Sequence, residues 1–143
     1  MTIPRGPAHS PGIDDLLRVD LAEDERAAGR ARRATRQSLV RWRLPGLVDA
    51  VVLAVSELVT NATRHGRPPV WIGLEHQRKQ VRLDVHDASP TEPPGMRAQA
   101  APDAESGRGL GIVQALADEV AVEQVTDDGK IIHVTFGVPR EGA

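Results

Sequence analysis

The sequence predicts an α+β fold, a two-layer α/β sandwich with helices on one face of a mixed, mostly antiparallel sheet. Three observations lead to this prediction. Short segments that alternate apolar and polar residues come in adjacent pairs, as antiparallel hairpins do. Longer segments between them carry apolar residues at spacings of three and four, as amphipathic helices do. The 143 residues contain no internal repeat and suit one domain with a real core.

The composition is that of a globular protein whose core is aliphatic. Hydrophobic residues make up 40% of the chain, charged residues 27%, and the net charge is −2, so nothing suggests binding to nucleic acid or to an acidic membrane. Aromatic residues, at 2%, are too few for the stacking platforms of single-strand nucleic-acid binders. Without cysteine there is no disulfide, thiol nucleophile or cysteine-bound metal. With no membrane-length apolar run and no signal peptide, we expect a cytoplasmic protein with no direct nucleic-acid or membrane contact.

The first half of the chain predicts a strand followed by two helices. Residues 1–12, rich in Pro and Gly, are expected to form a flexible arm before a single domain over residues 13–140. Alternation predicts a strand over Leu16–Ala22, and a stripe of small and apolar residues predicts a helix over Glu23–Trp42. A second helix begins near Pro45, with a core stripe formed by Val48, Val51, Val55, Leu58 and Ala62 and a stop signal at Gly66.

The second half predicts two hairpins separated by a loop and a helix. Val70–His76 and Gln80–Asp87 form the first hairpin, and residues 120–126 and 130–138 form the second around a favoured Asp-Asp-Gly turn. Between them, residues 88–106 lack periodicity, and a loop of this length in a compact domain is typical of an active-site lid. A glycine cluster at Gly107–Gly111 then turns into a helix.

The second helix carries a first group of chemical interest. Glu57 and Asn61 are spaced i, i+4 and therefore share one helical face, with Arg64 and His65 one turn later. This face borders the core stripe. Taken alone, a solvated helix face explains the group as well as a ligand site does. An asparagine in a helix interior has poor propensity, which slightly favours a functional role.

Two further signals follow along the chain. Asp87 closes a strand directly before the lid-like loop, either as a turn residue or as an acceptor for a donor group on a ligand. The glycines of Gly107–Gly111 allow close backbone approach, and the helix that follows offers N–H groups to an anion. This cluster is neither a P-loop, because G-x-x-x-x-G-K-[ST] is absent, nor a Rossmann fingerprint, because no strand precedes it.

Taken in order, these motifs resemble those of the GHKL superfamily of ATP-binding domains, which share the Bergerat fold. "SELVTNATRHG" is similar to the family's N box, "LDVHDASP" to its first Gly box and "GRGLGIV" to its second. The resemblance covers about residues 14–138. In its short format the chain most resembles the bacterial anti-sigma-factor serine kinases.

The resemblance implies a role for each matching residue. Asn61 would bind the Mg²⁺ that bridges the ATP phosphates, and Glu57 would orient or deprotonate the attacking nucleophile. Asp87 would accept a hydrogen bond from the adenine amino group. Around the nucleotide, the resemblance implies phosphate wrapping by Gly107, Arg108, Gly109, Leu110 and Gly111, and further contacts by Arg64, His65 and Thr135. The implied cofactors are ATP and Mg²⁺.

The implied function is a kinase-type regulator. The chain would phosphorylate a serine on an antagonist protein and sequester a sigma factor, as a homodimer. The first Gly box departs from the family, since Asp87 is followed by Ala88, Ser89 and Pro90 without the two usual glycines. This favours an alternative, a non-catalytic regulatory module that binds nucleotide only to set its conformation. A third possibility is the detached catalytic half of a histidine kinase.

The first helix is unusually basic. Seven arginines lie between residues 26 and 43, with Arg26, Arg30, Arg33 and Arg41 recurring along one face. A solvated helix face in an arginine-rich chain explains them. A docking face for an acidic partner, or part of a dimer interface, is the alternative.

Overall fold

The computed structural model describes residues 16–21, 25–89, 105–125 and 129–139, with only the backbone described at 105–108. The predicted arm (1–12) and residues 90–104 of the predicted lid lie outside the described residues. The elements are β1 (Leu16–Leu21), α1 (Ala27–Arg41), the short 3₁₀ helix η2 (Pro45–Leu47), α2 (Val48–His65), β2 (Val70–His76), β3 (Gln80–Asp87), α3 (Glu105–Leu116), β4 (Glu119–Val125) and β5 (Gly129–Gly137).

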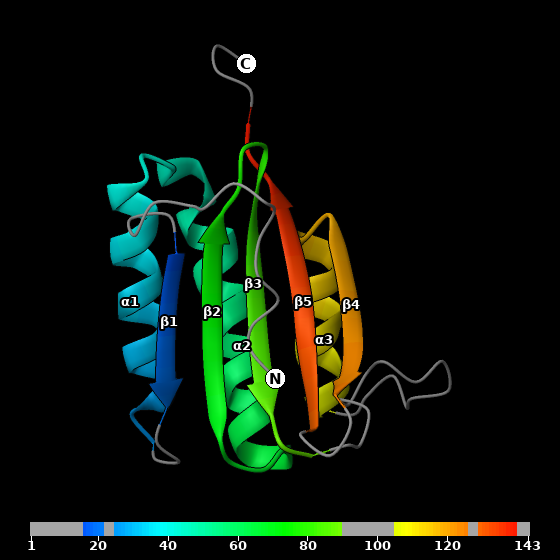
Figure 1. Cartoon of the computed structure of the whole chain (residues 1–143). Coiled ribbons are helices and arrows are strands. Elements are labelled where there is room, and N and C mark those ends of the chain that lie inside the picture. Colours follow the sequence, from blue (N-terminus) through cyan, green and yellow to red (C-terminus); the bar gives the residue numbers. More distant parts are fainter. Residues whose placement is uncertain (1–15, 22–24, 90–104, 126–128, 140–143) are drawn as a thin grey trace.

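The strands form one sheet with the order β1-β2-β3-β5-β4 (Figure 1). All four neighbouring pairs in it are antiparallel, so the α+β sandwich is confirmed but the expected mixture of strand directions is wrong for the described sheet. For two of these pairs, β2–β3 and β4–β5, the reason lies in the connection, because a tight hairpin can join only antiparallel strands.

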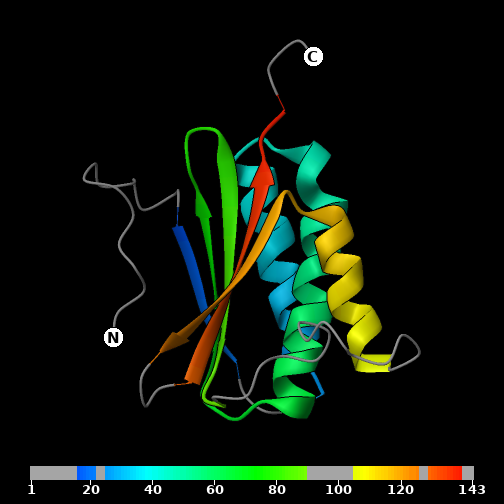
Figure 2. The same cartoon turned by 90° about the vertical axis from the view of Figure 1, so that its right-hand side faces the viewer.

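The helices lie together on one face of the sheet, which makes the second layer (Figure 2). Alternate residues of the strands point toward them, and those of β3 are Val81, Leu83 and Val85. The predicted stripe of α2 packs against these strands, with Val51, Val55 and Leu58 fully buried. The apolar stripe of the helix and every second residue of the strands therefore pack together in one aliphatic core.

Helix α2 belongs to this core although its composition resembles that of a membrane helix. Among the described residues, the segment Pro45–His65 is long and apolar enough to cross a membrane, with a mean hydropathy of 1.4. Half of the 18-residue window with this hydropathy is buried inside the protein. Packing against the sheet accounts for its apolar character.

Helix α3 begins earlier than predicted. It starts at Glu105, so the whole cluster Gly107–Gly111 is helical, where a glycine-rich approach to the helix was expected. Glycine is a poor helix former but is not forbidden in a helix. The anchor of the helix is apolar, because Leu110 and Val113 are fully buried in the core.

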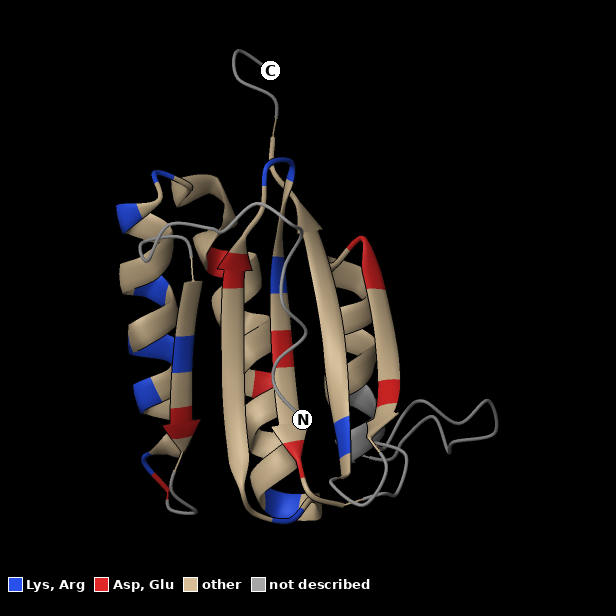
Figure 3. Cartoon of the chain, in the orientation of Figure 1, with Lys and Arg blue, Asp and Glu red and all other residues tan. Residues whose placement is uncertain are grey.

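The basic face of α1 is present as predicted. In Figure 3 the arginine positions of α1, coloured blue, follow one another along the helix at the edge of the molecule. No acidic residue lies within Ala27–Arg41, while Arg33, Arg36 and Arg41 are exposed. Arg32 instead donates a hydrogen bond to the Ser56 hydroxyl at 3.1 Å, tying α1 to α2.

Candidate nucleotide site

Glu57 and Asn61 lie one above the other on α2, at the edge of the core. Asn61 is 9% exposed and Glu57 is half-buried. Their neighbours in sequence, Leu58 and Ala62, point into the core, so the helix cannot rotate without exposing apolar surface. Core packing therefore fixes the direction in which this face of the helix projects, as a ligand site requires.

Helix α3 packs against α2 so that Gly109 faces this pair. A Cβ atom added to Gly109 would lie 2.8 Å from Oε1 of Glu57 and 3.9 Å from both side-chain polar atoms of Asn61. A side chain at position 109 would thus occupy the space in front of Glu57. The missing side chain is what allows the backbone of α3 to come this close.

The Asn61 amide is only partly satisfied. Its Nδ2 is buried and has no hydrogen-bond partner among the residues that the structure describes. Leaving a buried polar group unpaired costs about 1–3 kcal/mol. A buried polar group without a partner calls for an explanation, and a bound ion, water molecule or ligand is one of them.

Asp87 ends β3 and points to the same face of the sheet as the helices. It follows Val81, Leu83 and Val85 in the alternation of the strand and is 4% exposed. Its Oδ1 accepts hydrogen bonds from the backbone N–H groups of Ser89, at 2.8 Å, and Arg67, at 3.4 Å. The carboxylate thus organises the turn after the strand, as a local Asx-type acceptor does.

Lys130 is the charged partner of Asp87. It stands directly opposite Asp87 in the β3–β5 register, and its Nζ lies 3.1 Å from Oδ2 and 3.2 Å from Oδ1. The same ammonium group donates to the Ser89 carbonyl at 3.1 Å. Both side chains are almost fully buried, so this pair is shielded from solvent and from salt.

The end of α2 is tied to this turn. Ala88 donates a backbone hydrogen bond to the Arg67 carbonyl at 2.7 Å. The position of Gly66 faces the Asp87 carboxyl so closely that an added Cβ would lie 2.6 Å from Oδ1. Asn61 is five residues before Gly66, or about 7.5 Å along the helix axis at 1.5 Å per residue. Asp87 and the Glu57–Asn61 pair therefore lie at the same end of the molecule.

The other predicted site residues are not all brought to this place. Arg64 and His65 are exposed in the last turn of α2, near the Asp87 end. Leu110 is a core residue, and Gly111 is exposed with open space where a Cβ would lie. The side chain of Arg108 lies outside the described residues.

Thr135 lies on the opposite face of the sheet. It pairs with Arg82 of β3, whereas Asp87 pairs with Lys130. Because side chains alternate along a strand, Thr135 points away from the helices and from Asp87. The described structure therefore does not bring it together with the other candidate residues.

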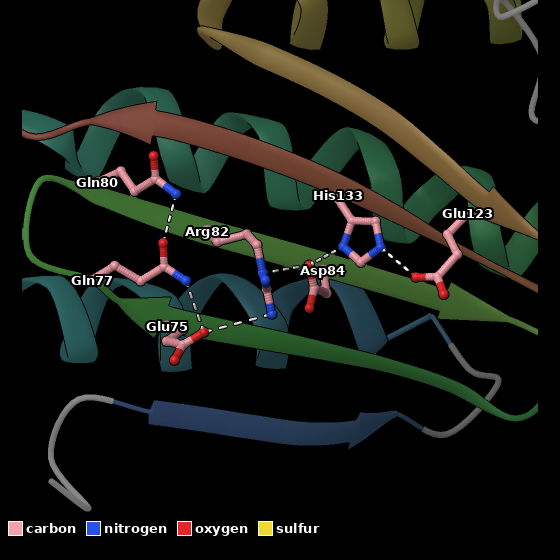
Figure 4. A network of polar contacts seen from close by, with 7 residues as sticks. All are labelled: Glu75, Gln77, Gln80, Arg82, Asp84, Glu123 and His133. Atoms are coloured by element: carbon pink, nitrogen blue, oxygen red, sulfur yellow. Dashed lines mark hydrogen bonds and ion pairs between the residues drawn. The ribbon is translucent and has the colours of Figure 1, made fainter. Parts of the chain in front are cut away.

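That opposite face carries a second polar cluster, which Figure 4 shows from close by. His133 lies between two carboxylates, with Nδ1 at 2.7 Å from Asp84 and Nε2 at 2.8 Å from Glu123. Arg82 extends the cluster to Asp84 at 3.2 Å and to Glu75 at 3.6 Å. Hydrogen bonding to Asp84 is the main reason why the pKa of His133 is raised; burial opposes this effect and Glu123 adds to it.

Sequence reasoning missed Lys130, Ser89 and the close packing of Gly66 on Asp87. Lys130 left one signal, since it is one of only two lysines in an arginine-rich chain, the other being Lys79. Its pairing with Asp87 spans 43 residues and depends on the strand register, which no local pattern reveals.

Comparisons with known proteins agree with this fold. The histidine kinase-like ATPase domain family matches residues 21–136. A solved structure with the same fold is the crystal structure of the RsbU and RsbW domains of Rv1364c from Mycobacterium tuberculosis, at 21% identity and a TM-score of 0.64. The match covers 87% of this chain and 32% of that one, so the chain spans about a third of its length. No curated protein matches the sequence.

Proposed function

Because the chain belongs to the histidine kinase-like ATPase domain family, we propose that it binds ATP with Mg²⁺ between α2, α3 and the end of β3. In this proposal the site serves an anti-sigma-factor-like regulator that phosphorylates a serine on an antagonist protein. The observation that carries the proposal is the buried Asn61 amide, unpartnered at Nδ2 among the described residues, beside Glu57 and beneath Gly109.

The donor set fits a magnesium ion. Mg²⁺ takes oxygen ligands and keeps several waters, so one protein oxygen beside phosphate oxygens is sufficient. Asn61 can offer its amide oxygen there, because the two ends of an amide have nearly the same shape and exchange by a turn about the last bond. Bound Mg²⁺ would neutralise charge on the phosphates.

Glu57 has the position of a group that handles the nucleophile. It stands one turn before Asn61 on the same face, and it is half-buried. A carboxylate there can accept a hydrogen bond from a serine hydroxyl or a water molecule and orient it toward a phosphoryl group. Asp87, held by the Ser89 and Arg67 N–H groups, would accept a hydrogen bond from the amino group of adenine.

The experiment measures nucleotide binding and label transfer separately. The full chain is titrated with ATP, with and without Mg²⁺, and then incubated with γ-labelled ATP and a lysate of its source cells. We expect Asn61→Ala to lose the Mg²⁺-dependent part of the affinity. Glu57→Gln should keep binding and lose label transfer by about 100- to 10,000-fold, as the removal of a general base does.

Matched variants separate these effects from loss of folding. Glu119→Gln makes the same change on the exposed start of β4, and Gln37→Ala removes an exposed amide from α1. Both should behave as the unmodified chain. If the unmodified chain does not bind ATP, or if Asn61→Ala binds it equally well with Mg²⁺, the proposed function is wrong.

A second candidate function is the non-catalytic regulatory module. The observation that favours it is the turn after Asp87, where the run Ala88-Ser89-Pro90 lacks the usual glycines and Lys130 donates a hydrogen bond to the Ser89 carbonyl. ATP binding without transfer of label to any protein would support this module. Acid-stable label on serine would support the kinase, and acid-labile label on histidine would support a detached histidine kinase half.

The proposed partners are a sigma factor and its antagonist, with the exposed arginines of α1 as a candidate contact surface. A homodimer and a cytoplasmic location are part of the same proposal. Sedimentation of the purified chain with and without ATP tests the dimer.

A further inference from the structure

Lys130 has an unusual environment for a lysine. Its side chain is 5% exposed, and its Nζ is in contact with three oxygens, namely Oδ1 and Oδ2 of Asp87 and the Ser89 carbonyl. Three acceptors match the three N–H donors of an ammonium group. Burying such a pair is seldom more stabilising than a hydrophobic pair of the same size. Its presence therefore calls for a role other than stability.

The hydrogen bonds of Asp87 are distributed unequally between its two oxygens. Oδ1 accepts from Ser89 N, Arg67 N and Lys130 Nζ, whereas Oδ2 contacts only Lys130 among the described residues. A carboxylate offers about four lone-pair positions. Oδ2 thus keeps capacity for one more donor, while Oδ1 is fully used.

We propose that Lys130 is a positioning residue for nucleobase recognition, which sets the Asp87 carboxylate so that Oδ2 is turned toward the donor group of the base. The inference rests on the proposed function, in which Asp87 reads that donor. Through one nitrogen, Lys130 links the start of β5 to the last residue of β3 and to the turn at Ser89. Without it, the carboxylate could rotate about its last bond and share both oxygens with the two backbone N–H groups.

The geometry also explains why this position holds lysine in a chain whose basic residues are almost all arginine. An ammonium group is a compact point charge, and three oxygens can surround it. A guanidinium group is planar and spreads its donors over a fork that matches one carboxylate.

The test compares two nucleotides that differ only at the group to be read. ATP carries the 6-amino group, and purine riboside triphosphate has hydrogen in its place. For the unmodified chain we expect ATP to bind about tenfold more tightly or better, because a hydrogen bond to a charged acceptor is lost. Lys130→Met should reduce this preference to within about threefold. Both affinities are measured by calorimetry in the full chain, with thermal unfolding recorded for every variant.

Three variants make the result decisive. Asp87→Asn changes the reading group itself and should also lose the preference. Lys79→Met removes the other lysine, which is exposed in the β2–β3 turn, and should leave the preference unchanged. Lys130→Arg keeps the buried charge and should fold even if Lys130→Met does not. Its preference should lie between those of the unmodified chain and Asp87→Asn, because the planar group cannot hold both Asp87 and Ser89.

The outcomes separate the two proposals. A merely structural Lys130 would weaken both nucleotides equally and keep their ratio, which would overturn the positioning role. If the preference is lost in Asp87→Asn but retained in both Lys130 variants, the positioning role of Lys130 is overturned and the proposed function is left intact. Absence of ATP binding in the unmodified chain, or no preference in it, would overturn the proposed base recognition and the Lys130 role with it.

Discussion

Gly109 of α3 lies so close to Glu57 of α2 that an added Cβ atom would stand 2.8 Å from the Glu57 Oε1. The two residues are far apart in the sequence, yet Gly109 lacks a side chain at the place where Glu57 projects its carboxylate. The contact joins the helix that carries Glu57 and Asn61 to the helix that contains the glycine cluster. Four predictions follow from this and other contacts of the described structure.

The first prediction concerns Gly109 itself. Gly109→Ala should lower ATP affinity and displace Glu57, although alanine is the better helix former by about 1 kcal/mol. Gly111→Ala, in the same helix but with open space around it, should instead raise the free energy of unfolding by about 0.5–1 kcal/mol. Titration with ATP checks Gly109→Ala, and chemical denaturation checks Gly111→Ala. An unchanged ATP affinity in Gly109→Ala would contradict the prediction.

The second prediction separates function from stability at Asn61. Asn61→Ala removes a buried Nδ2 that has no partner among the described residues, and it improves helix propensity, so the free energy of unfolding should stay equal or rise by about 1 kcal/mol. Leu58→Ala, on the adjacent core face, should lower it by about 2–5 kcal/mol. Urea unfolding of the chain without nucleotide measures both. A strong loss in Asn61→Ala would mean that the amide has structural partners.

The third prediction concerns Gly129, which has a φ of +93° and packs against the Asp87 carbonyl. Gly129→Ala should destabilise the protein by about 1–3 kcal/mol, from the left-handed backbone alone, with the steric conflict in addition. Gly46→Ala is the matched control, because nothing lies within 4 Å of an added Cβ there. Thermal unfolding distinguishes the two, and equal melting temperatures would contradict the prediction.

The fourth prediction is a pH dependence of stability from His133. Its pKa is raised in the folded state, chiefly by Asp84. The stabilisation is therefore fully present below the unfolded pKa of about 6.5 and is lost as the pH rises through the higher folded value. His133→Gln should flatten this fall, whereas His65→Gln, in the exposed last turn of α2, should leave it in place. Denaturation midpoints of the unmodified chain and both variants, measured from pH 5.5 upward, test this prediction.

The sequence by itself determined the local elements and the first pair of site residues. Both hairpins, α1 and α2 could be predicted because apolar periods of 2 and 3.6 follow from backbone geometry. The same geometry places Glu57 and Asn61 on one helical face, so their pairing required no tertiary knowledge. The predicted family, too, depended on these local motifs and is confirmed by the match over residues 21–136.

Only the tertiary structure decided what lies opposite these residues. The β3–β5 register pairs Asp87 with Lys130 and puts Thr135 on the other face, and a shift of one residue would reverse both. The docking of α3 sets Gly109 on Glu57 and makes the glycine cluster helical. Register and docking depend on burying apolar surface between segments far apart in the chain. For that reason the local sequence predicts which residues carry chemistry, whereas the packed core decides which of them meet.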